Sequence, residues 1–297
     1  MFLVELCCHQ GRSNPKCDFM RRIYMTLMPL ALFLCMTQAC LAKMRQVVWV
    51  YSSQTARMQE IEKLDSCLNA REVQTYKCVL DYEGQTLASL ADSLHTFLGQ
   101  SSLAYDDSVA LFSVEDCSYV VMREALRNGN VRMLLTLSGR FLNGDDYLYN
   151  LFSIQENARN MDDFSVDMGR QESLRRVYTM IQGIKRGKKV KIPQEASAPE
   201  KECMRYLSGP LGRSVILNDS EHVLRHLACP VFSIYSQQDK FWDFLSHQEF
   251  LQSQLNDGDT PYETYGPLQY SGDLLDKSAV NVLLDRMMNL YDATYEK

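Results

Sequence analysis

Residues 107–128 contain the side chains whose spacing is best suited to nucleophilic chemistry. An apolar strand is predicted at 107–113 and a helix at 116–128, with a tight turn between them. A strand-to-helix turn can lift a serine or cysteine clear of a sheet, where it can attack a carbonyl carbon. The centre of this turn is Val114, which has no nucleophilic atom. We therefore expect a relaxed, chemically silent turn, with Val114 packed against the end of the sheet.

Three neighbours of Val114 carry groups that could replace a missing nucleophile, namely Ser113, Cys117 and Ser118. Cys117 is the strongest alternative, because a position in the first turn of a helix lowers the pKa of a thiol. None of the three has small residues on both sides at the spacing that such a turn requires. Displaced nucleophilic catalysis is therefore the weaker hypothesis.

Four histidines follow residue 43, and none is spaced to serve the predicted turn: His95, His222, His226 and His247. His222 and His226 stand four residues apart on a predicted helix, a spacing that can hold zinc. No glutamate follows His222 as in a zinc-protease helix, and no third ligand stands out. We therefore expect neither a metal site nor a bound cofactor.

The composition is that of an ordinary globular protein. The chain has 297 residues, 46% of them hydrophobic, and a formal net charge of −6. Binding to nucleic acid needs a concentrated basic face, so this balance argues against such a partner. The basic run at 185–191 is expected to be a solvated loop. A small molecule or a peptide remains as the expected partner.

Residues 20–42 have the pattern of an export signal. Two arginines precede an apolar run at 27–36, which is too short to span a membrane, and small residues follow it. We expect cleavage after Ala39 or Ala42 and export to a bacterial periplasm or cell envelope. Cys40 follows an alanine, as in a lipoprotein signal, so a lipid anchor at Cys40 is the alternative and the only membrane attachment expected.

From residue 46 onward, apolar runs alternate with amphipathic stretches. Strands are predicted at 46–52, 76–81, 107–113, 131–138, 230–236 and 261–265. Helices are predicted at 55–70, 85–99, 116–128, 144–160, 168–184, 198–207, 219–227, 243–256 and 278–294. This alternation predicts an α/β fold with a mostly parallel sheet of about six strands and helices on both faces.

The alternation is interrupted once, which divides the chain into four parts. Residues 1–42 form an extension and signal peptide, and 43–139 form the first half of the α/β core. Residues 140–228 have only helical patterns and are predicted to form a cap over the carboxyl ends of the strands. Residues 229–297 complete the core. Ligands of open α/β sheets bind at those carboxyl ends.

The order of elements and three degraded motifs resemble the α/β-hydrolase superfamily over roughly 46–295, especially its capped, secreted esterases and peptidases. Val114 stands at the serine position of the G-x-S-x-G turn. Asp239, after the strand at 230–236, matches the acid of the catalytic triad. Gln269 stands where the superfamily has its histidine.

The resemblance implies a Ser–His–Asp mechanism whose residues are mostly absent. Valine cannot attack a carbonyl carbon, and glutamine cannot accept and return a proton near neutral pH. The loop at 51–54 has no glycine, which implies an impaired oxyanion hole. The favoured hypothesis is an exported, catalytically inactive protein that binds a ligand under its cap. The rival is a serine- or cysteine-type hydrolase of esters or peptides with a displaced nucleophile.

Overall fold

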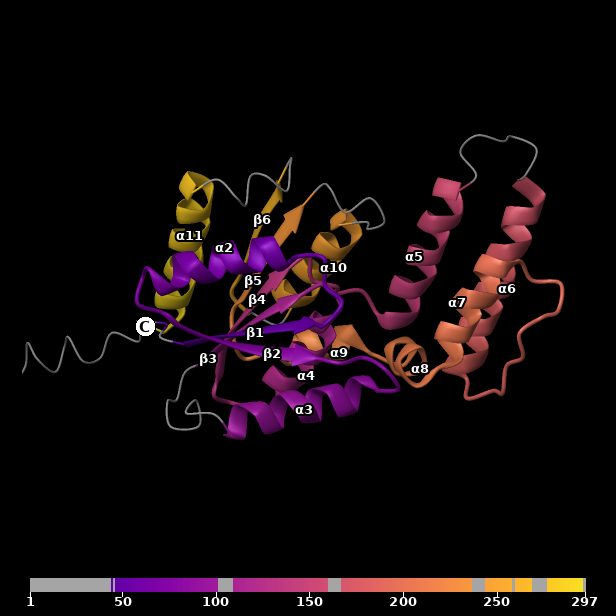
Figure 1. Cartoon of the computed structure of the whole chain (residues 1–297), viewed down its shortest axis with the longest axis horizontal. Helices are drawn as coiled ribbons and strands as arrows, with labels where there is room; N and C mark the ends of the chain where they lie inside the picture. The colour runs from indigo at the N-terminus through magenta and orange to yellow at the C-terminus, as the bar shows by residue number, and fades with distance from the viewer. Residues whose placement is uncertain are drawn as a thin grey trace, which may run out of the picture. The chain divides into compact units, whose positions relative to one another are not determined.

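The computed structural model describes residues 44, 46–100, 109–159, 167–236, 244–257, 260–268 and 277–295. Residues Met44–Thr294 form one compact unit. Its centre is a six-stranded sheet in the order β2-β1-β3-β4-β5-β6, and every neighbouring pair is parallel (Figure 1). The predicted α/β fold with a parallel sheet of about six strands is confirmed.

The strands occupy the predicted places, with ends shifted by a few residues. They are β1 (Gln46–Ser52), β2 (Gln74–Leu80), β3 (Val109–Val114), β4 (Val131–Leu137), β5 (Val231–Ser236) and β6 (Tyr262–Leu268). Every residue of β3 is buried, because the strand lies in the middle of the sheet and is covered on both faces. Trp49 of β1 stacks on Phe112 of β3 with ring centroids 4.1 Å apart. Its indole nitrogen donates a hydrogen bond to Asp65 at 2.9 Å.

Helices cover both faces of the sheet, as predicted (Figure 1). On one face lie α2 (Met58–Asn69) and α11 (Lys277–Tyr295), and Arg71, just after α2, forms an ion pair with Asp285 of α11 at 2.8 Å. On the other lie α3 (Leu87–Gln100) and α4 (Cys117–Arg127), joined by Arg127 and Asp92. The helix α10 (Phe244–Asp257) connects β5 to β6.

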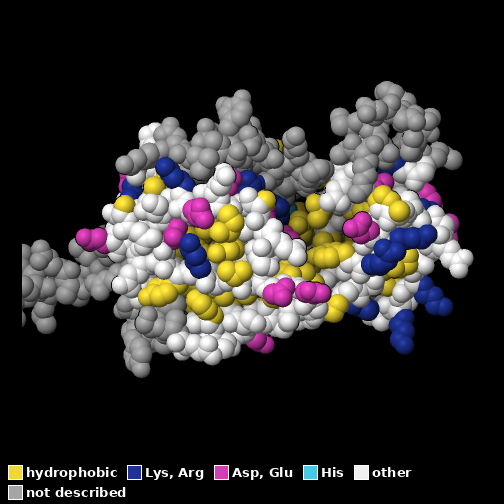
Figure 2. Space-filling view, viewed as in Figure 1, with side chains coloured by type: hydrophobic (Ala, Val, Ile, Leu, Met, Phe, Trp, Pro, Cys, Tyr) yellow, Lys and Arg dark blue, Asp and Glu magenta, His cyan; other side chains and the backbone are white. Residues whose placement is uncertain are grey.

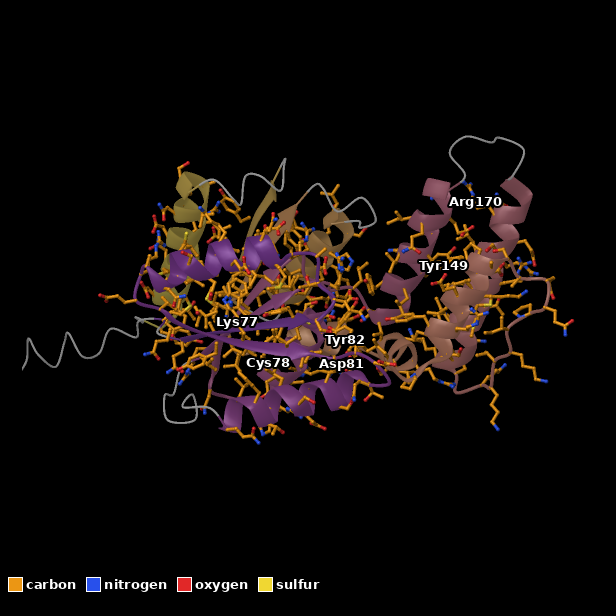
Figure 3. The ribbon with its side chains drawn as sticks, viewed as in Figure 1. Lys77, Cys78, Asp81, Tyr82, Tyr149 and Arg170 are labelled. Carbon is orange, nitrogen blue, oxygen red and sulfur yellow. The ribbon has the colours of Figure 1, made fainter. Side chains whose placement is uncertain are left out.

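The strand β2 is an edge strand, and its two faces differ. Cys78 is buried, whereas Lys77 and Val79 are exposed. Figure 2 shows hydrophobic side chains beside charged ones on the face of the molecule that Figure 1 presents. A lysine on an edge strand discourages pairing with another chain. Figure 3 shows Asp81 and Tyr82 directly after the end of this strand.

Between β4 and β5 the described residues form five helices and no strand. They are α5 (Gly144–Arg159), α6 (Asp167–Lys185), α7 (Ala198–Ser208), α8 (Pro210–Ile216) and α9 (Ser220–Arg225). Tyr149 of α5 and Tyr178 of α6 meet edge to face at 5.4 Å. Arg176 of α6 forms a two-pronged ion pair with Glu200 of α7, a buried residue that also completes the capping box of α7. We call α5–α8 the helical insertion.

The sequence did not predict α8. Its first residue is Pro210, preceded by Gly209 and followed by Gly212, a composition that indicates a loop. Proline suits the first position of a helix, where its missing N–H is not needed. At Gly212 a side chain would collide with the backbone of Tyr206, so the glycine permits close packing of α8 on α7.

Several expectations fall on other parts of the chain. The signal peptide, its cleavage sites and Cys40 lie outside the described residues, as do Asp239 and Gln269. The domain boundaries remain predictions. No described helix is both long enough and apolar enough to cross a membrane.

Candidate functional site

The turn between β3 and α4 is strained, which contradicts the expected relaxed turn. The left-handed residue is Glu115, with φ of 52°, one position after Val114. Val114 still belongs to β3, and its side chain is buried as expected. Left-handed backbone costs a non-glycine residue roughly 1–2 kcal/mol. The strained turn is therefore centred on a carboxylate.

Glu115 is held at this turn through its backbone and lies near a cation. Its N–H donates to the carbonyl oxygen of Leu137 at the end of β4, at 2.9 Å. One carboxylate oxygen lies 3.7 Å from the guanidinium of Arg57, the N-cap residue of α2. Arg57 also pairs with Glu60 at 3.3 Å. The Glu115 side chain is one third exposed, with 33% of its surface accessible to solvent.

Asp116 is the N-cap residue of α4 and links this helix to the helical insertion. The hydroxyl of Tyr147 on α5 donates to Oδ1 of Asp116 at 2.8 Å. The Nε of Arg140 lies 3.5 Å from the same oxygen, and its guanidinium lies 5.8 Å from the centre of the Tyr147 ring. Burial, with the Asp116 charge, raises the pKa of Tyr147 well above its usual range. The phenol therefore stays protonated and acts as a donor.

Cys117 does not have the activated thiol that its helix position predicted. It is almost fully buried, and its Sγ lies 2.9 Å from the hydroxyl of Tyr82. Burial, more than any other cause, raises the pKa of Cys117 far above that of an ordinary thiol, and the charges of Asp116 and Glu115 add to this. The expected lowering of the pKa was wrong because loss of solvent outweighs the helix N-terminus.

Ser113 and Ser118 are buried, and their hydroxyls already form hydrogen bonds with backbone groups. Ser113 Oγ donates to the carbonyl oxygen of Leu135 at 3.4 Å. Ser118 Oγ lies 2.8 Å from the Arg140 carbonyl oxygen and accepts from the Arg140 N–H at 2.7 Å. These bonds join β3 and α4 to the residues that follow β4, so both hydroxyls are parts of the packing around the turn.

The four described histidines lie in three different settings. His95 on α3 is mostly exposed and lies 2.9 Å from Glu124. His222 on α9 and His226, the C-cap residue of α9, have ring centroids 4.4 Å apart, and no described group of three or more ligands could hold a metal with them. His247 on α10 is buried, and its Nδ1 accepts the N–H of Phe141 at 2.8 Å. Burial and the nearby Arg140 charge hold the pKa of His247 well below its usual range.

Sequence reasoning missed Tyr147, Arg140 and Ser138. Tyr147 and Arg140 lie near Asp116 only because of long-range packing, which no local sequence pattern predicts. The backbone of Ser138 is in the left-handed region, with φ of 54°. The residue is fully buried, and its hydroxyl has no hydrogen-bond partner among the described residues. Gly139 follows it, where a side-chain carbon would lie 2.7 Å from Thr136 Oγ1. A serine–glycine pair after an apolar strand was the available signal for this turn.

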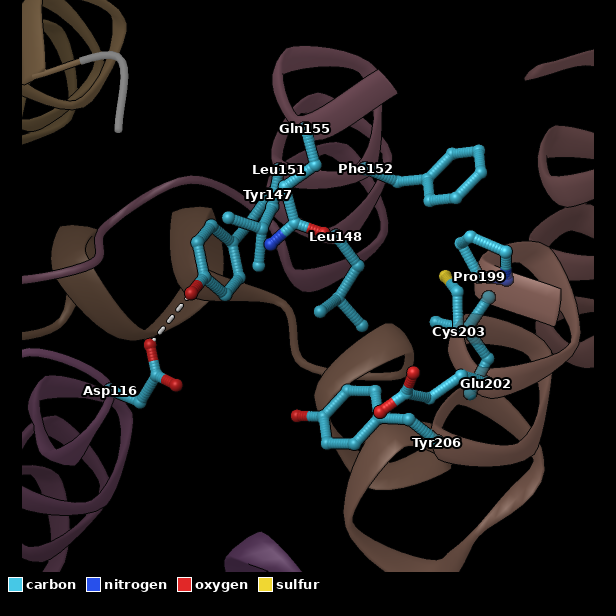
Figure 4. A pocket seen from close by; sticks show the side chains of 11 residues that line it. Asp116, Tyr147, Leu148, Leu151, Phe152, Gln155, Pro199, Glu202, Cys203 and Tyr206 are labelled. Atoms are coloured by element: carbon cyan, nitrogen blue, oxygen red, sulfur yellow. Dashed lines mark hydrogen bonds between the residues drawn. The ribbon is translucent and has the colours of Figure 1, made fainter. Parts of the chain in front are cut away.

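A pocket of about 670 Å³ lies beside Asp116, between the start of α4 and the helices α5 and α7 (Figure 4). Its polar lining consists of Asp116, Tyr147, Gln155, Glu202 and Tyr206. Its apolar lining consists of Leu148, Leu151, Phe152, Pro199, Cys203 and Leu207. This size and this mixture of apolar walls with a few polar groups are typical of small-molecule sites.

Comparison with known proteins gives similar structures only. No family model and no curated protein matches the chain. Similar solved structures include a lipase-esterase related protein from Clostridium acetobutylicum, with 15% identity and a TM-score of 0.47, covering 83% of this chain and 94% of that one. Est1E from Butyrivibrio proteoclasticus has 12% identity and a TM-score of 0.47, covering 82% and 89%. The α/β hydrolase GrgF from a Penicillium species has 10% identity and a TM-score of 0.47, covering 85% and 91%. At such values these similarities carry no argument about the chemistry of this chain.

Proposed function

We propose that this chain is a divergent α/β-hydrolase-like protein that lacks serine catalysis and binds an apolar small molecule in the pocket between α4, α5 and α7. The observation that carries the proposal is the carboxylate of Glu115 at the left-handed position of the strand-to-helix turn. A hydrolase of this type needs a serine at such a turn and an imidazole to accept its proton.

The alternative nucleophiles favour the same proposal. Cys117 is buried with a raised pKa, so it carries almost no thiolate at neutral pH. The hydroxyls of Ser113 and Ser118 bond to backbone groups. With no nucleophile available, the pocket is the feature of this region that a proposed function has to explain. The helical insertion then serves as a cap that supplies two of the three walls of the pocket.

The absence of catalysis is tested with a fluorophosphonate probe and with p-nitrophenyl butyrate. We expect no labelling beyond that of heat-denatured protein, and no turnover. Turnover that is abolished by Cys117→Ala or Ser113→Ala would establish the rival hypothesis, a hydrolase with a displaced nucleophile.

Binding is tested with Nile red, a neutral dye that fluoresces in apolar surroundings. We expect the full-length protein to bind the dye and Leu151→Trp to lose binding, because the larger ring fills the pocket. Leu126→Trp is the matched control, since Leu126 is an exposed leucine of α4 that does not line the pocket. Equal binding by both variants would place the dye elsewhere and contradict the proposal.

Export is a separate part of the proposal and rests on the sequence of residues 20–42. Mass spectrometry of the native protein tests it. A new N-terminus after Ala39 or Ala42 supports export, and a lipidated Cys40 supports membrane anchoring. A protein that retains Met1 or Met20 contradicts both.

A further inference from the structure

The charged groups that line the pocket all have the same sign. Asp116 is the N-cap residue of α4 and Glu202 belongs to α7, and the two lie on opposite sides of the space (Figure 4). Among the described residues, no lysine, arginine or histidine lines the pocket. The walls of the pocket therefore offer a ligand hydrogen-bond acceptors and negative charge, together with the hydroxyls of Tyr147 and Tyr206.

The two carboxylates are compensated to different degrees. Oδ1 of Asp116 has Tyr147 at 2.8 Å and Arg140 at 3.5 Å, so part of its charge is neutralised. Oδ2 of Asp116 accepts no hydrogen bond from any described residue, and in Figure 4 it points toward the side on which Tyr206 lies. Glu202 is exposed and has no ion-pair partner in the described part of the chain. The pocket thus carries net negative charge.

The apolar groups occupy the rest of the lining. Leu148, Leu151 and Phe152 of α5 face Pro199, Cys203 and Leu207 of α7. An alkyl chain that lies between these two helices is removed from water, which is favourable in proportion to its buried area. A fatty-acid anion would bring its carboxylate near Asp116 and Glu202, where like charges repel. An ammonium group would be attracted there and could donate to Oδ2 of Asp116.

We infer that the pocket selects amphiphiles with a cationic amine head group and an alkyl chain over fatty-acid anions of the same length. This inference rests on the proposed function, since it names the class of ligand that the pocket binds. Neutral alcohols of equal chain length should bind with an affinity between those of the amines and the fatty-acid anions, because they keep the apolar contacts and lack the charge.

Competition against Nile red tests the inference at neutral pH and low salt. The competitors are dodecylamine, dodecanol and dodecanoate, all kept below the concentrations at which they aggregate. We expect dodecylamine to displace the dye at about tenfold lower concentration than dodecanoate, since each partly exposed charge contributes a few-fold. Raising the salt concentration should narrow the difference between the displacing concentrations of dodecylamine and dodecanoate, because salt screens the charges.

Variants show whether the preference comes from the pocket. Glu202→Gln should reduce the preference for dodecylamine over dodecanoate to about threefold. Glu202→Gln combined with Asp116→Asn should reduce this preference to about twofold or less. Glu62→Gln removes an exposed acid of α2 that does not line the pocket, so it should leave the preference unchanged. Glu202 is exposed, which makes its variant safe for folding.

The outcomes separate this inference from the proposed function. If Nile red does not bind, or Leu151→Trp does not remove it, the pocket is not the ligand site and both fail. If the dye binds in the pocket but dodecanoate competes as well as dodecylamine, the selectivity is wrong and the proposed function stands. A preference that Glu62→Gln reduces as much as Glu202→Gln would also overturn the inference.

Discussion

At the scale of single residues, Glu115 allows a direct test of backbone strain. Glu115→Gly and Glu115→Ala both remove the carboxylate near Arg57, but only glycine relieves the left-handed backbone. We expect the glycine variant to be more stable than the alanine variant by about 1 kcal/mol. Urea unfolding of the two variants measures the difference.

The control for this comparison is the same pair of substitutions at an ordinary helical position. Glu62 is an exposed residue of α2, where alanine should be more stable than glycine by about 1 kcal/mol. A reversal of the order between the two positions is the expected result. If alanine is also the better residue at position 115, the turn there is not left-handed in solution.

His247 should make the stability of the protein depend on pH. Its pKa lies well below the ordinary value of 6.5, since it is buried and lies near Arg140. Below pH 6.5 the unfolded chain therefore binds a proton that the folded chain does not, so the free energy of unfolding decreases as the pH falls. Between pH 6.5 and 5.5 the loss should be about 1 kcal/mol.

The variant His247→Asn isolates this contribution, because asparagine keeps an acceptor for the N–H of Phe141 but does not titrate. Urea unfolding of both proteins over this pH range gives the two slopes. The variant should lose less stability on acidification than the natural protein. Parallel slopes would show that His247 titrates normally in the folded state.

At the scale of elements, the contact between α5 and α8 depends on a glycine. A side-chain carbon at Gly144, the first residue of α5, would overlap the carbonyl oxygen of Val215 on α8. Gly144→Ala should therefore cost about 2–3 kcal/mol of stability, because packed backbone must move apart. Gly169→Ala on α6 has open space and should be neutral or stabilising. Equal effects of the two substitutions on thermal unfolding would contradict this packing.

The elements themselves were largely predictable, because apolar periodicity reports burial directly. The turn was misjudged by one residue for a physical reason. The strand was predicted to end at Ser113, but Ser113 lies inside the sheet, where its hydroxyl donates to the carbonyl oxygen of Leu135. β3 therefore continues to Val114, and the reversal falls on Glu115.

The polar surroundings of the turn were less predictable than the strands. Tyr147 of α5 and Arg140, which lies between β4 and α5, reach Asp116 from segments that are distant in the sequence, so only the tertiary fold brings them together. The lowered pKa expected for Cys117 came from a local rule about helix ends. Burial, which depends on the whole fold, raises the pKa of Cys117 instead of lowering it.

At the scale of the whole molecule, the five described cysteines are thiols that differ in accessibility. Cys67 and Cys203 are half-buried, whereas Cys78, Cys117 and Cys229 are buried. Burial raises the pKa of Cys78 to about 11 and that of Cys229 to about 12, which lowers the thiolate population. We expect iodoacetamide at pH 8 to label Cys67 and Cys203 first.

Peptide mass spectrometry assigns each labelled site, and ligand protection adds an internal control. Cys203 lines the pocket and Cys67 does not, so Nile red should slow labelling of Cys203 alone. Labelling of Cys117 as fast as that of Cys203 would show that the turn is open to solvent.

The long excursion between β4 and β5 has a consequence for the order of folding. Among β1 to β4, the longest stretch between two paired strands is residues 53–108, between β1 and β3, whereas β4 meets β5 only after residues 138–230. Closing that long loop costs the most chain entropy of any pairing in the sheet. Synthesis also delivers β5 and β6 last, so β4 is left as an open edge until they arrive, and such edges invite association between chains. The nascent protein is therefore most vulnerable to aggregation while its helical insertion is being made, and amide protection should appear in β1, β3 and β4 before β5.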